Sequence, residues 1–318
     1  MVVAAAFTMK AAVISETFSS NPAGRNWRTY GYTNLFRWNS TNQNLDVTWD
    51  SAQTNSYFYQ PLGTILGKSD DFSVAFDLKI NDIAVGVNAG KPFSFPLCLG
   101  FQNASNAAGS NFFRGNGHAS PNLAEFAFYP DSGFGPTLWP SFWSTNSSLN
   151  YNGSADYTII DLPIGVAMHI AMTYTASNKT CVTAITTNGV SIGTINEVRL
   201  ASNFTDFRVD TFAVESYSDA GQNPDDGGSL LAHGTVDNLV VTIPPLPVLD
   251  LRGVFTNGQR QVQFTSRTNW NYILQRSENF QGWTSASPTT SGTGTNLFLQ
   301  DTNVPAGKLF YRVRADRP

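Results

Sequence analysis

Apolar and polar residues alternate with a period of two along most of this chain. The pattern is clearest in FSVAFDLKI (72–80), AMHIAMTY (167–174), FRVDTFAVES (207–216) and GTVDNLVVTI (234–243). Because successive side chains of a β-strand point to opposite faces of a sheet, each segment predicts a strand with one buried and one exposed face. No window of twelve residues shows the period of an amphipathic helix, so we expect an all-β protein.

Turn residues and prolines divide these predicted strands. Asn188-Gly189 lies between CVTAIT (181–186) and VSIGTI (190–195), and this dipeptide favours the tight turn of a β-hairpin. The segment IPPLPVLDL (243–251) contains three prolines, which lack the N–H that a sheet requires and which stiffen a linker. We therefore expect a domain boundary there. The strands expected after it are RQVQFTS (260–266), NYILQRS (271–277), LFLQD (297–301) and LFYRVRA (309–315).

Composition narrows the classes of function. Charged residues make up 13% of the 318 residues, against about 25% in typical globular domains, while aromatic residues also reach 13%. This composition suits packed sheets joined by Asn- and Gly-rich turns. The net charge is −4 and no basic block occurs, which argues against nucleic-acid binding through phosphates. No apolar run is long enough to span a membrane.

Residues 16–243 resemble the concanavalin A-like jelly roll of legume-type lectins, laminin G-like modules and many glycan-active enzymes. The segments that carry the resemblance are ETFSS, DDFSVAFDLKI, LAEFAFYPDSG, MHIAMTYTASNKTCVTAIT and VDNLVVTIP. It implies a jelly-roll β-sandwich over 1–243, in which the first and last strands are neighbours. Glu16 and Asp237 would then lie side by side, where this fold has precedent for a structural calcium ion.

Residues 248–318 resemble the small fibronectin type III-like modules found near the C-termini of large secreted bacterial proteins. YILQRSENFQGW and LFYRVRA carry this second resemblance. It implies a Pro-rich linker at 244–249, a smaller β-sandwich at 250–318, and an extracellular or cell-surface location. It implies no chemistry.

Catalytic groups are sparse. Glu125 lies in the central predicted strand LAEFAFYPD, but its same-face neighbours are Leu123 and Ala127, and the paired acids of jelly-roll hydrolases are absent. In DFRVD, Arg208 between Asp206 and Asp210 favours a salt-bridge ladder. The three histidines lie in unrelated contexts. We therefore expect a protein that is not an enzyme, with polysaccharide hydrolase or lyase activity as the weakest reading.

An aromatic segment is the candidate ligand site. SGFGPTLWPSFW (132–143) combines Phe and Trp with Pro, and no strand alternation returns until about Tyr157. Long loops in compact domains are usually functional or packed on themselves. Aromatic faces beside amide and hydroxyl groups suit sugar rings. The glycan-binding candidates are Trp139, Trp143, Tyr151, Asn146, Ser147 and Asn150. The alternative is that some of these aromatic residues close the core.

Calcium is the only cofactor with candidate ligands. Carboxylate and amide oxygens in a glycine-rich loop suit this ion, although a plain solvated turn explains the same pattern. The weak candidates are Asp219, Asn223, Asp225 and Asp226 in the loop, and Glu16 with Asp237 at the strand ends. Cys98 and Cys181 lie in strand-like runs and fit either a disulfide or two buried thiols.

The predicted function is non-catalytic glycan binding by a secreted protein. The alternative is a structural subunit of a filament or surface layer. In that reading the apolar segment at 1–14 pairs with a neighbouring subunit by strand addition. Otherwise this segment is an ordinary leading strand of the first domain.

Overall fold

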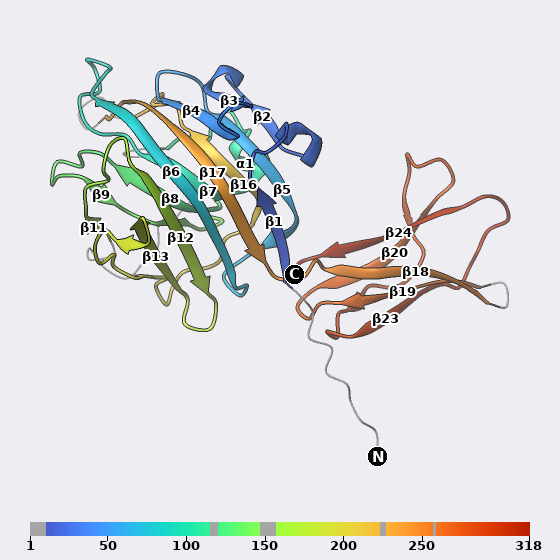
Figure 1. Ribbon diagram of the computed structural model, residues 1–318. Helices are drawn as coiled ribbons and strands as arrows, with labels where there is room; N and C mark the ends of the chain where they lie inside the picture. Colours follow the sequence, from blue (N-terminus) through green and yellow to red (C-terminus); the bar gives the residue numbers. More distant parts are fainter. Residues whose placement is uncertain (1–10, 115–119, 147–156, 223–226, 257–258) are drawn as a thin grey trace. The chain divides into compact units, whose positions relative to one another are not determined.

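The computed structural model describes residues 11–114, 120–146, 157–222, 227–256 and 259–318. The chain divides into two compact units, Val13–Ile243 and a second that contains Pro244–Pro318. Strands make up most of the described residues (Figure 1), and helical turns are limited there to Pro22–Arg25, Thr33–Leu35 and α1 (Ala104–Ala107). No described helix has the length and apolar character needed to cross a membrane. The all-β fold class predicted from the sequence is confirmed.

The first unit consists of two antiparallel sheets stacked in two layers (Figure 1). One, here the β6 sheet, has the order β14-β13-β12-β6-β17-β4-β3, with β1 paired to β17 and β15 to β13. The other, here the β7 sheet, has the order β11-β9-β8-β7-β16-β5-β2, with β10 paired to β8. The strands of the β6 sheet are β1 (Ala12–Glu16), β3 (Phe36–Asn39), β4 (Asn44–Asp50), β6 (Phe72–Val85), β12 (Ala167–Thr175), β13 (Thr180–Thr187), β14 (Val190–Ser191), β15 (Val198–Arg199) and β17 (Leu230–Ile243). Those of the β7 sheet are β2 (Arg28–Tyr30), β5 (Ser56–Leu66), β7 (Leu97–Gln102), β8 (Leu123–Tyr129), β9 (Thr137–Leu138), β10 (Ser141–Trp143), β11 (Thr158–Ile159) and β16 (Val209–Ser216).

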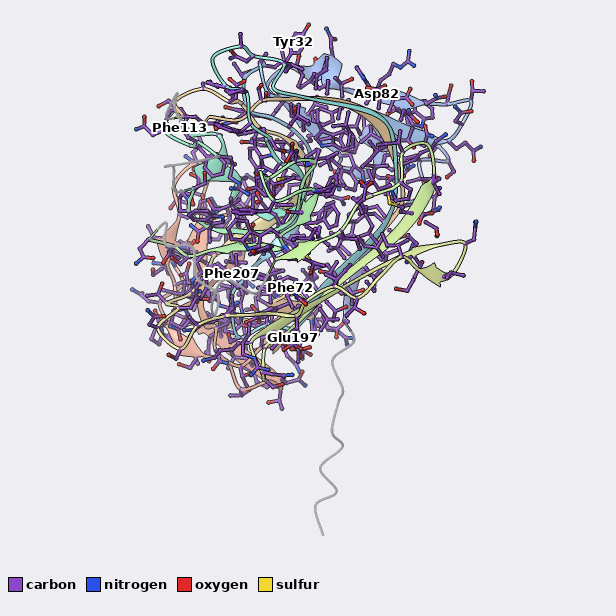
Figure 2. The ribbon with its side chains drawn as sticks, turned by 90° about the vertical axis from the view of Figure 1, so that its left-hand side faces the viewer. Tyr32, Phe72, Asp82, Phe113, Glu197 and Phe207 are labelled. Atoms are coloured by element: carbon purple, nitrogen blue, oxygen red, sulfur yellow. The ribbon has the colours of Figure 1, made fainter. Side chains whose placement is uncertain are left out.

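The core of this unit lies between the two sheets. Alternate side chains of β6 point into it, and Phe76 packs edge-on against Phe126 of β8 with ring centroids 5.8 Å apart. Phe72 packs in the same way against Phe207, at 6.0 Å, and Figure 2 labels both residues. Full burial of one Phe side chain stabilises the fold by about 1.5–3 kcal/mol. The apolar residues of the period-two pattern are therefore the side chains that face the core.

Two local predictions are confirmed. Asn188 and Gly189 have φ values of 49° and 77°, the left-handed conformation that a two-residue hairpin turn requires, and Thr187 pairs directly with Val190. The first and last strands of the unit, β1 and β17, lie side by side. Residues 1–10 of the apolar leading segment lie outside the described residues. Residues 12–16 pair with β17 of their own chain.

The segment after Tyr129 differs from its prediction as one long loop. Strands β9 and β10 occur within it, and both pair with β8, as shown by the opposed residues Phe128 and Leu138 and by Glu125 and Ser141. The residues between them, Trp139 and Pro140, form an irregularity that interrupts the alternation in the sequence. The pattern was therefore hidden because each strand is only two or three residues long.

The cysteines are two separate buried thiols. Cys98 belongs to β7 and Cys181 to β13, so they lie in different sheets. The disulfide alternative is not realised in this structure.

The second unit is also built from antiparallel strands. One sheet has the order β18-β19-β23, and the other has β20 paired with β21, β22 and β24. The strands are β18 (Val248–Thr256), β19 (Gln259–Ser266), β20 (Asn271–Ser277), β21 (Thr284–Ser285), β22 (Thr290–Ser291), β23 (Asn296–Asp301) and β24 (Phe310–Asp316). Phe264, Tyr272 and Leu274 are buried in its core. The Tyr272 hydroxyl donates a hydrogen bond to the carbonyl oxygen of Pro247 at 2.6 Å, which ties the proline segment to this unit. Its likeness to fibronectin type III stays a prediction.

Candidate functional site

The outer face of the β7 sheet carries the polar and aromatic side chains with the clearest chemical character. Leu99 of β7 is paired with Phe126 and Val214 in the core layer. The residues next to these in the sequence therefore point to the opposite face. Cys98, Glu125 and Glu215 lie there, and all three side chains are fully buried. Other parts of the chain consequently cover this part of the outer face.

Four residues, Arg114, Glu125, Glu215 and Tyr217, form what we call the acid–arginine cluster. The Nη2 group of Arg114 donates a hydrogen bond to Oε2 of Glu125 at 2.6 Å, and the Tyr217 hydroxyl donates one to Oε1. The Arg114 guanidinium also lies over the Tyr217 ring, 5.5 Å from its centroid. Charge-assisted bonds of this type are stronger than neutral ones and fix the orientation of the carboxylate.

Glu215 approaches the same carboxylate from β16. Burial raises the pKa of Glu215 well above its usual value, the nearby Glu125 carboxylate raises it further, and Arg114 acts in the opposite direction. Neither carboxyl oxygen of Glu215 makes a hydrogen bond of ordinary geometry to a described residue. The cluster thus places two acids next to one cation. This arrangement favours the neutral form of Glu215, because the single positive charge is already paired with Glu125.

Gly100 of β7 lies directly opposite Glu125. A Cβ atom at this position would come within 2.5 Å of the Ala124 carbonyl oxygen and 2.6 Å of the Glu125 Cα. The glycine is therefore required for the close approach of β8 to β7 that places Glu125.

An aromatic trio lies on the same face, formed by Tyr129, Trp139 and Tyr157. The Trp139 ring centroid is 6.3 Å from that of Tyr129 and 6.2 Å from that of Tyr157. All three residues are half-buried, so part of each side chain reaches the surface. The backbone N–H of Trp139 donates to the Ala127 carbonyl oxygen at 2.8 Å, which anchors the tryptophan on β8. The exposed Asn196 donates its side-chain amide to the Tyr157 carbonyl oxygen at 2.9 Å.

The structure describes three of the six glycan-binding candidates, namely Trp139, Trp143 and Asn146. Trp139 belongs to the trio, whereas Trp143 is a half-buried residue of β10 with the Arg114 guanidinium 5.7 Å from its ring centroid. Asn146 is exposed and accepts a hydrogen bond from the Ser144 hydroxyl. Ser147, Asn150 and Tyr151 lie outside the described residues. Of the other aromatic residues in this segment, Phe142 is fully buried in the core and Phe134 is 76% exposed.

The calcium candidates that the structure describes make contacts with protein groups. Glu16 is buried and binds Arg25 through both carboxylate oxygens. Burial raises the pKa of Asp237, the hydrogen bond from the Asn238 N–H acts in the opposite direction, and the nearby Asp77 and Glu16 carboxylates raise it further. Asp219 forms an ion pair with Lys91 at 2.7 Å and accepts a hydrogen bond from Ser51. In Glu16 and Asp219 a cationic side chain therefore binds carboxylate oxygens that a metal would need.

The remaining loop candidates, Asn223, Asp225 and Asp226, lie outside the described residues. Within the part that the structure describes, no group of three or more His, Cys, Asp or Glu side chains could hold a metal ion. The acids of the DFRVD segment bind Arg208 and a backbone N–H group. Asp206 pairs with Arg208 at 3.5 Å, and Asp210 accepts a hydrogen bond from the Ala104 N–H.

Sequence reasoning missed most of the outer-face residues. Arg114 lies in no strand, and Glu215 and Glu125 are ninety residues apart on strands that are not adjacent. A search for acids along one strand could not join them. One signal was available, because the alternation in LAEFAFY places Glu125 and Tyr129 on the same face.

Comparisons with known proteins give likenesses of fold only. No family model matches the chain, and no curated protein matches it. A peanut lectin structure with a nine-residue peptide is 14% identical, with 72% of this chain and 99% of that chain covered and a TM-score of 0.44. The lectin UEA-II complexed with galactose is 11% identical, with coverages of 72% and 98% and a TM-score of 0.44. The carbohydrate recognition domain of Emp47p is 11% identical, with coverages of 72% and 97% and a TM-score of 0.38. These values are too low to support any argument about a binding site.

Proposed function

We propose that this protein is a non-catalytic glycan-binding protein whose sugar-binding surface is the aromatic trio on the outer face of the β7 sheet. The observation that supports the proposal is the half-buried Trp139, held between Tyr129 and Tyr157 at ring distances of 6.3 and 6.2 Å. A side chain held in this way loses little conformational freedom when a ligand binds.

The chemistry of the trio suits a sugar ring. Pyranose rings present patches of C–H groups beside hydroxyl groups, so they need an apolar surface with polar groups at its border. The exposed parts of the three aromatic side chains offer the first, and the exposed Asn196 amide next to Tyr157 offers the second. Trp143 has a supporting role in this proposal, because Arg114 lies against its ring and links it to the acid–arginine cluster.

The burial of the two acids argues against hydrolysis. Glycosidases place two carboxyl groups on either side of an exposed scissile bond, about 5–9.5 Å apart according to mechanism. Glu125 and Glu215 are each 0% exposed, and Glu125 accepts hydrogen bonds from Arg114 and Tyr217. A substrate would have to displace Arg114 from the Glu125 carboxylate. The pair therefore fits a structural role beneath the surface.

The filament alternative has less support. Strand addition needs an unpaired donor strand, and the last three residues of the candidate donor 1–14 belong to β1, which pairs with β17 of the same chain. The proposed extracellular setting rests on the resemblance of YILQRSENFQGW and LFYRVRA to modules of secreted proteins.

The test is binding of the full chain to an array of neutral oligosaccharides, followed by titration of the best ligand with variants. We expect Trp139→Ala to weaken binding about tenfold, which corresponds to about 1.4 kcal/mol. Phe298→Ala is the matched control, because Phe298 is an aromatic residue of β23 with 51% exposure. Circular dichroism in the aromatic region confirms that each variant is folded. Unchanged affinity in a folded Trp139→Ala variant would refute the proposed site.

A further inference from the structure

We propose that the second unit carries a separate surface that binds acidic polysaccharides, meaning chains of sugars that bear carboxylate or sulfate groups. The surface is formed by Phe280, Trp283, Lys308, Phe310 and Arg312, and we call it the aromatic–cationic surface. It lies on a different unit from the aromatic trio and selects a different ligand class, so it does not depend on the function proposed above.

The pairing of β20 with β24 brings these residues together. In this antiparallel pair Ser277 lies opposite Phe310 and Gln275 opposite Arg312. Phe280 and Trp283 follow directly after β20, in the connection to β21. The ring centroid of Phe280 lies 3.7 Å from that of Phe310 and 6.3 Å from that of Trp283. The indole N–H of Trp283 donates to the Phe280 carbonyl oxygen at 3.2 Å, which fixes the turn.

The aromatic part of this surface is accessible. Phe280 is 61% exposed, and Trp283 and Phe310 are half-buried. A single exposed apolar side chain needs no explanation, but three rings in contact form a patch that water solvates poorly. The rings are held by strand pairing and by one hydrogen bond, so the patch is preformed.

Two cations lie on these rings without carboxylate partners. The guanidinium of Arg312 is 4.3 Å from the Trp283 ring centroid, and its Nε donates to the neutral Gln275 side chain at 2.9 Å. The ammonium group of Lys308 is 5.2 Å from the Phe310 ring centroid. Neither residue forms an ion pair within the described residues. The neighbouring Arg276 and Arg314 differ in this respect, because they pair with Asp301 and Asp316 at 2.9 Å.

The charge of the chain is divided unequally. Residues 244–318 contain eight basic and four acidic side chains, for a net charge of +4, whereas residues 1–243 contain eleven and nineteen, for a net charge of −8. An anionic ligand is therefore attracted to the second unit and repelled by the first. Lys308 and Arg312 add unpaired positive charge at the exposed rings.

The ratio of rings to cations favours an acidic polysaccharide over nucleic acid. Three aromatic side chains stand beside two cations without ion-pair partners, which matches a chain with alternating apolar sugar faces and separated anionic groups. A nucleic acid carries a phosphate on every nucleotide, and its binding sites neutralise several of them. A guanidinium stacked on an indole keeps its N–H groups at the ring edge, where they can donate to a carboxylate.

The experiment is titration of the full chain with polygalacturonate and with its methyl-esterified form, which has the same backbone without the charges. We expect binding to polygalacturonate that weakens as salt is added, and binding to the ester at least about tenfold weaker. Trp283→Ala and Arg312→Gln should each weaken polygalacturonate binding about fivefold.

Two controls match these changes. Arg314→Gln removes the same charge from the same strand, but at an ion-paired position, and Phe298→Ala removes an exposed ring from the other sheet of the unit. Both should stay within about twofold of the parent chain. Lys308→Gln changes an exposed position and serves if Arg312→Gln fails to fold.

Three outcomes would overturn the proposal. The first is equal binding of polygalacturonate and its ester, and the second is tighter binding of an oligothymidine of similar length. The third is a folded Trp283→Ala variant that binds polygalacturonate as tightly as the parent chain does. The same conclusion follows if the only defect of this variant is a loss of self-association, measured by sedimentation. Trp139→Ala is expected to leave polygalacturonate binding unchanged, which separates this test from that of the aromatic trio.

Discussion

Removal of the cation from the acid–arginine cluster should destabilise the first unit strongly. In Arg114→Met the side-chain volume is roughly kept, but Glu125 loses its 2.6 Å ion pair and remains fully buried. Breaking a buried pair from one side costs about 3–5 kcal/mol, because an uncompensated charge is left away from water. For a unit of this size each kcal/mol lowers Tm by about 2–4 °C, so we expect a fall of about 6–20 °C.

The same substitution at an exposed ion pair provides the control. Arg37 pairs with Asp46 at 2.9 Å, but its side chain is 78% exposed. Exposed pairs contribute about 0–1 kcal/mol, so Arg37→Met should shift Tm by no more than about 4 °C. The double variant Arg114→Met with Glu125→Gln should recover much of the lost stability, because it removes both buried charges.

The assay is differential scanning calorimetry of the full chain at low and moderate salt. The first unit is identified by its own transition, because the two units are expected to unfold separately. If Arg114→Met and Arg37→Met lower Tm equally, the Glu125 carboxylate is not left buried without a compensating charge, and the description of the cluster is wrong. No recovery in the double variant would contradict the electrostatic explanation and point to lost packing against Trp143 and Tyr217.

Three further predictions follow from the same face. Because burial and Glu125 raise the pKa of Glu215, its contribution to stability is fully present below its usual pKa and is lost as pH rises towards the raised value. Glu215→Gln should therefore make the Tm of the first unit less dependent on pH above the usual pKa of a glutamate, and an unchanged pH profile would contradict a raised pKa of Glu215. Gly100→Ala should destabilise the unit, because the added Cβ would lie 2.5 Å from a backbone oxygen. Gly24→Ala is the control and should be nearly neutral, because a Cβ there would meet no atom within 4 Å. Equal Tm values for the two variants would refute the close approach of β8 to β7. Trp143→Ala should lower Tm more than Trp139→Ala does, since Trp143 packs against the buried Arg114, and the opposite order in calorimetry would reverse their assigned roles.

The sequence was informative where a single strand carries the pattern. The alternation in FSVAFDLKI predicted β6 and its buried face, and Asn188-Gly189 predicted a hairpin whose φ values require those residues. These features are local, so spacing along the chain is enough to find them. The short strands β9 and β10 were missed because a two-residue strand cannot show a period.

The site was harder to predict because it is assembled across strands. Glu125 was judged by its neighbours on β8, yet the groups that decide its chemistry are Arg114 and Tyr217, which come from other parts of the chain. Trp139 was identified from its residue type and loop position, whereas its partners Tyr129 and Tyr157 are set by the pairing of β9 with β8 and β11. Two of the predicted calcium ligands, Glu16 and Asp219, are paired with Arg25 and Lys91 in the structure. The pairing of Asp219 with Lys91 joins residues far apart in the sequence, so local spacing could not predict it.

The most direct test of glycan binding by the aromatic trio is the response of the tryptophan indole N–H signals in a nitrogen-15 correlation spectrum. The chain has seven tryptophans, and replacement of each by Phe assigns its signal. When the best neutral oligosaccharide is added, we expect the Trp139 signal to shift in proportion to the occupancy of the sugar-binding surface. The signals of Trp27 and Trp49, which are 3% and 1% exposed in the core, should remain in place. Saturable binding that leaves the Trp139 signal unmoved, or that moves only the Trp283 signal, would contradict the proposed site.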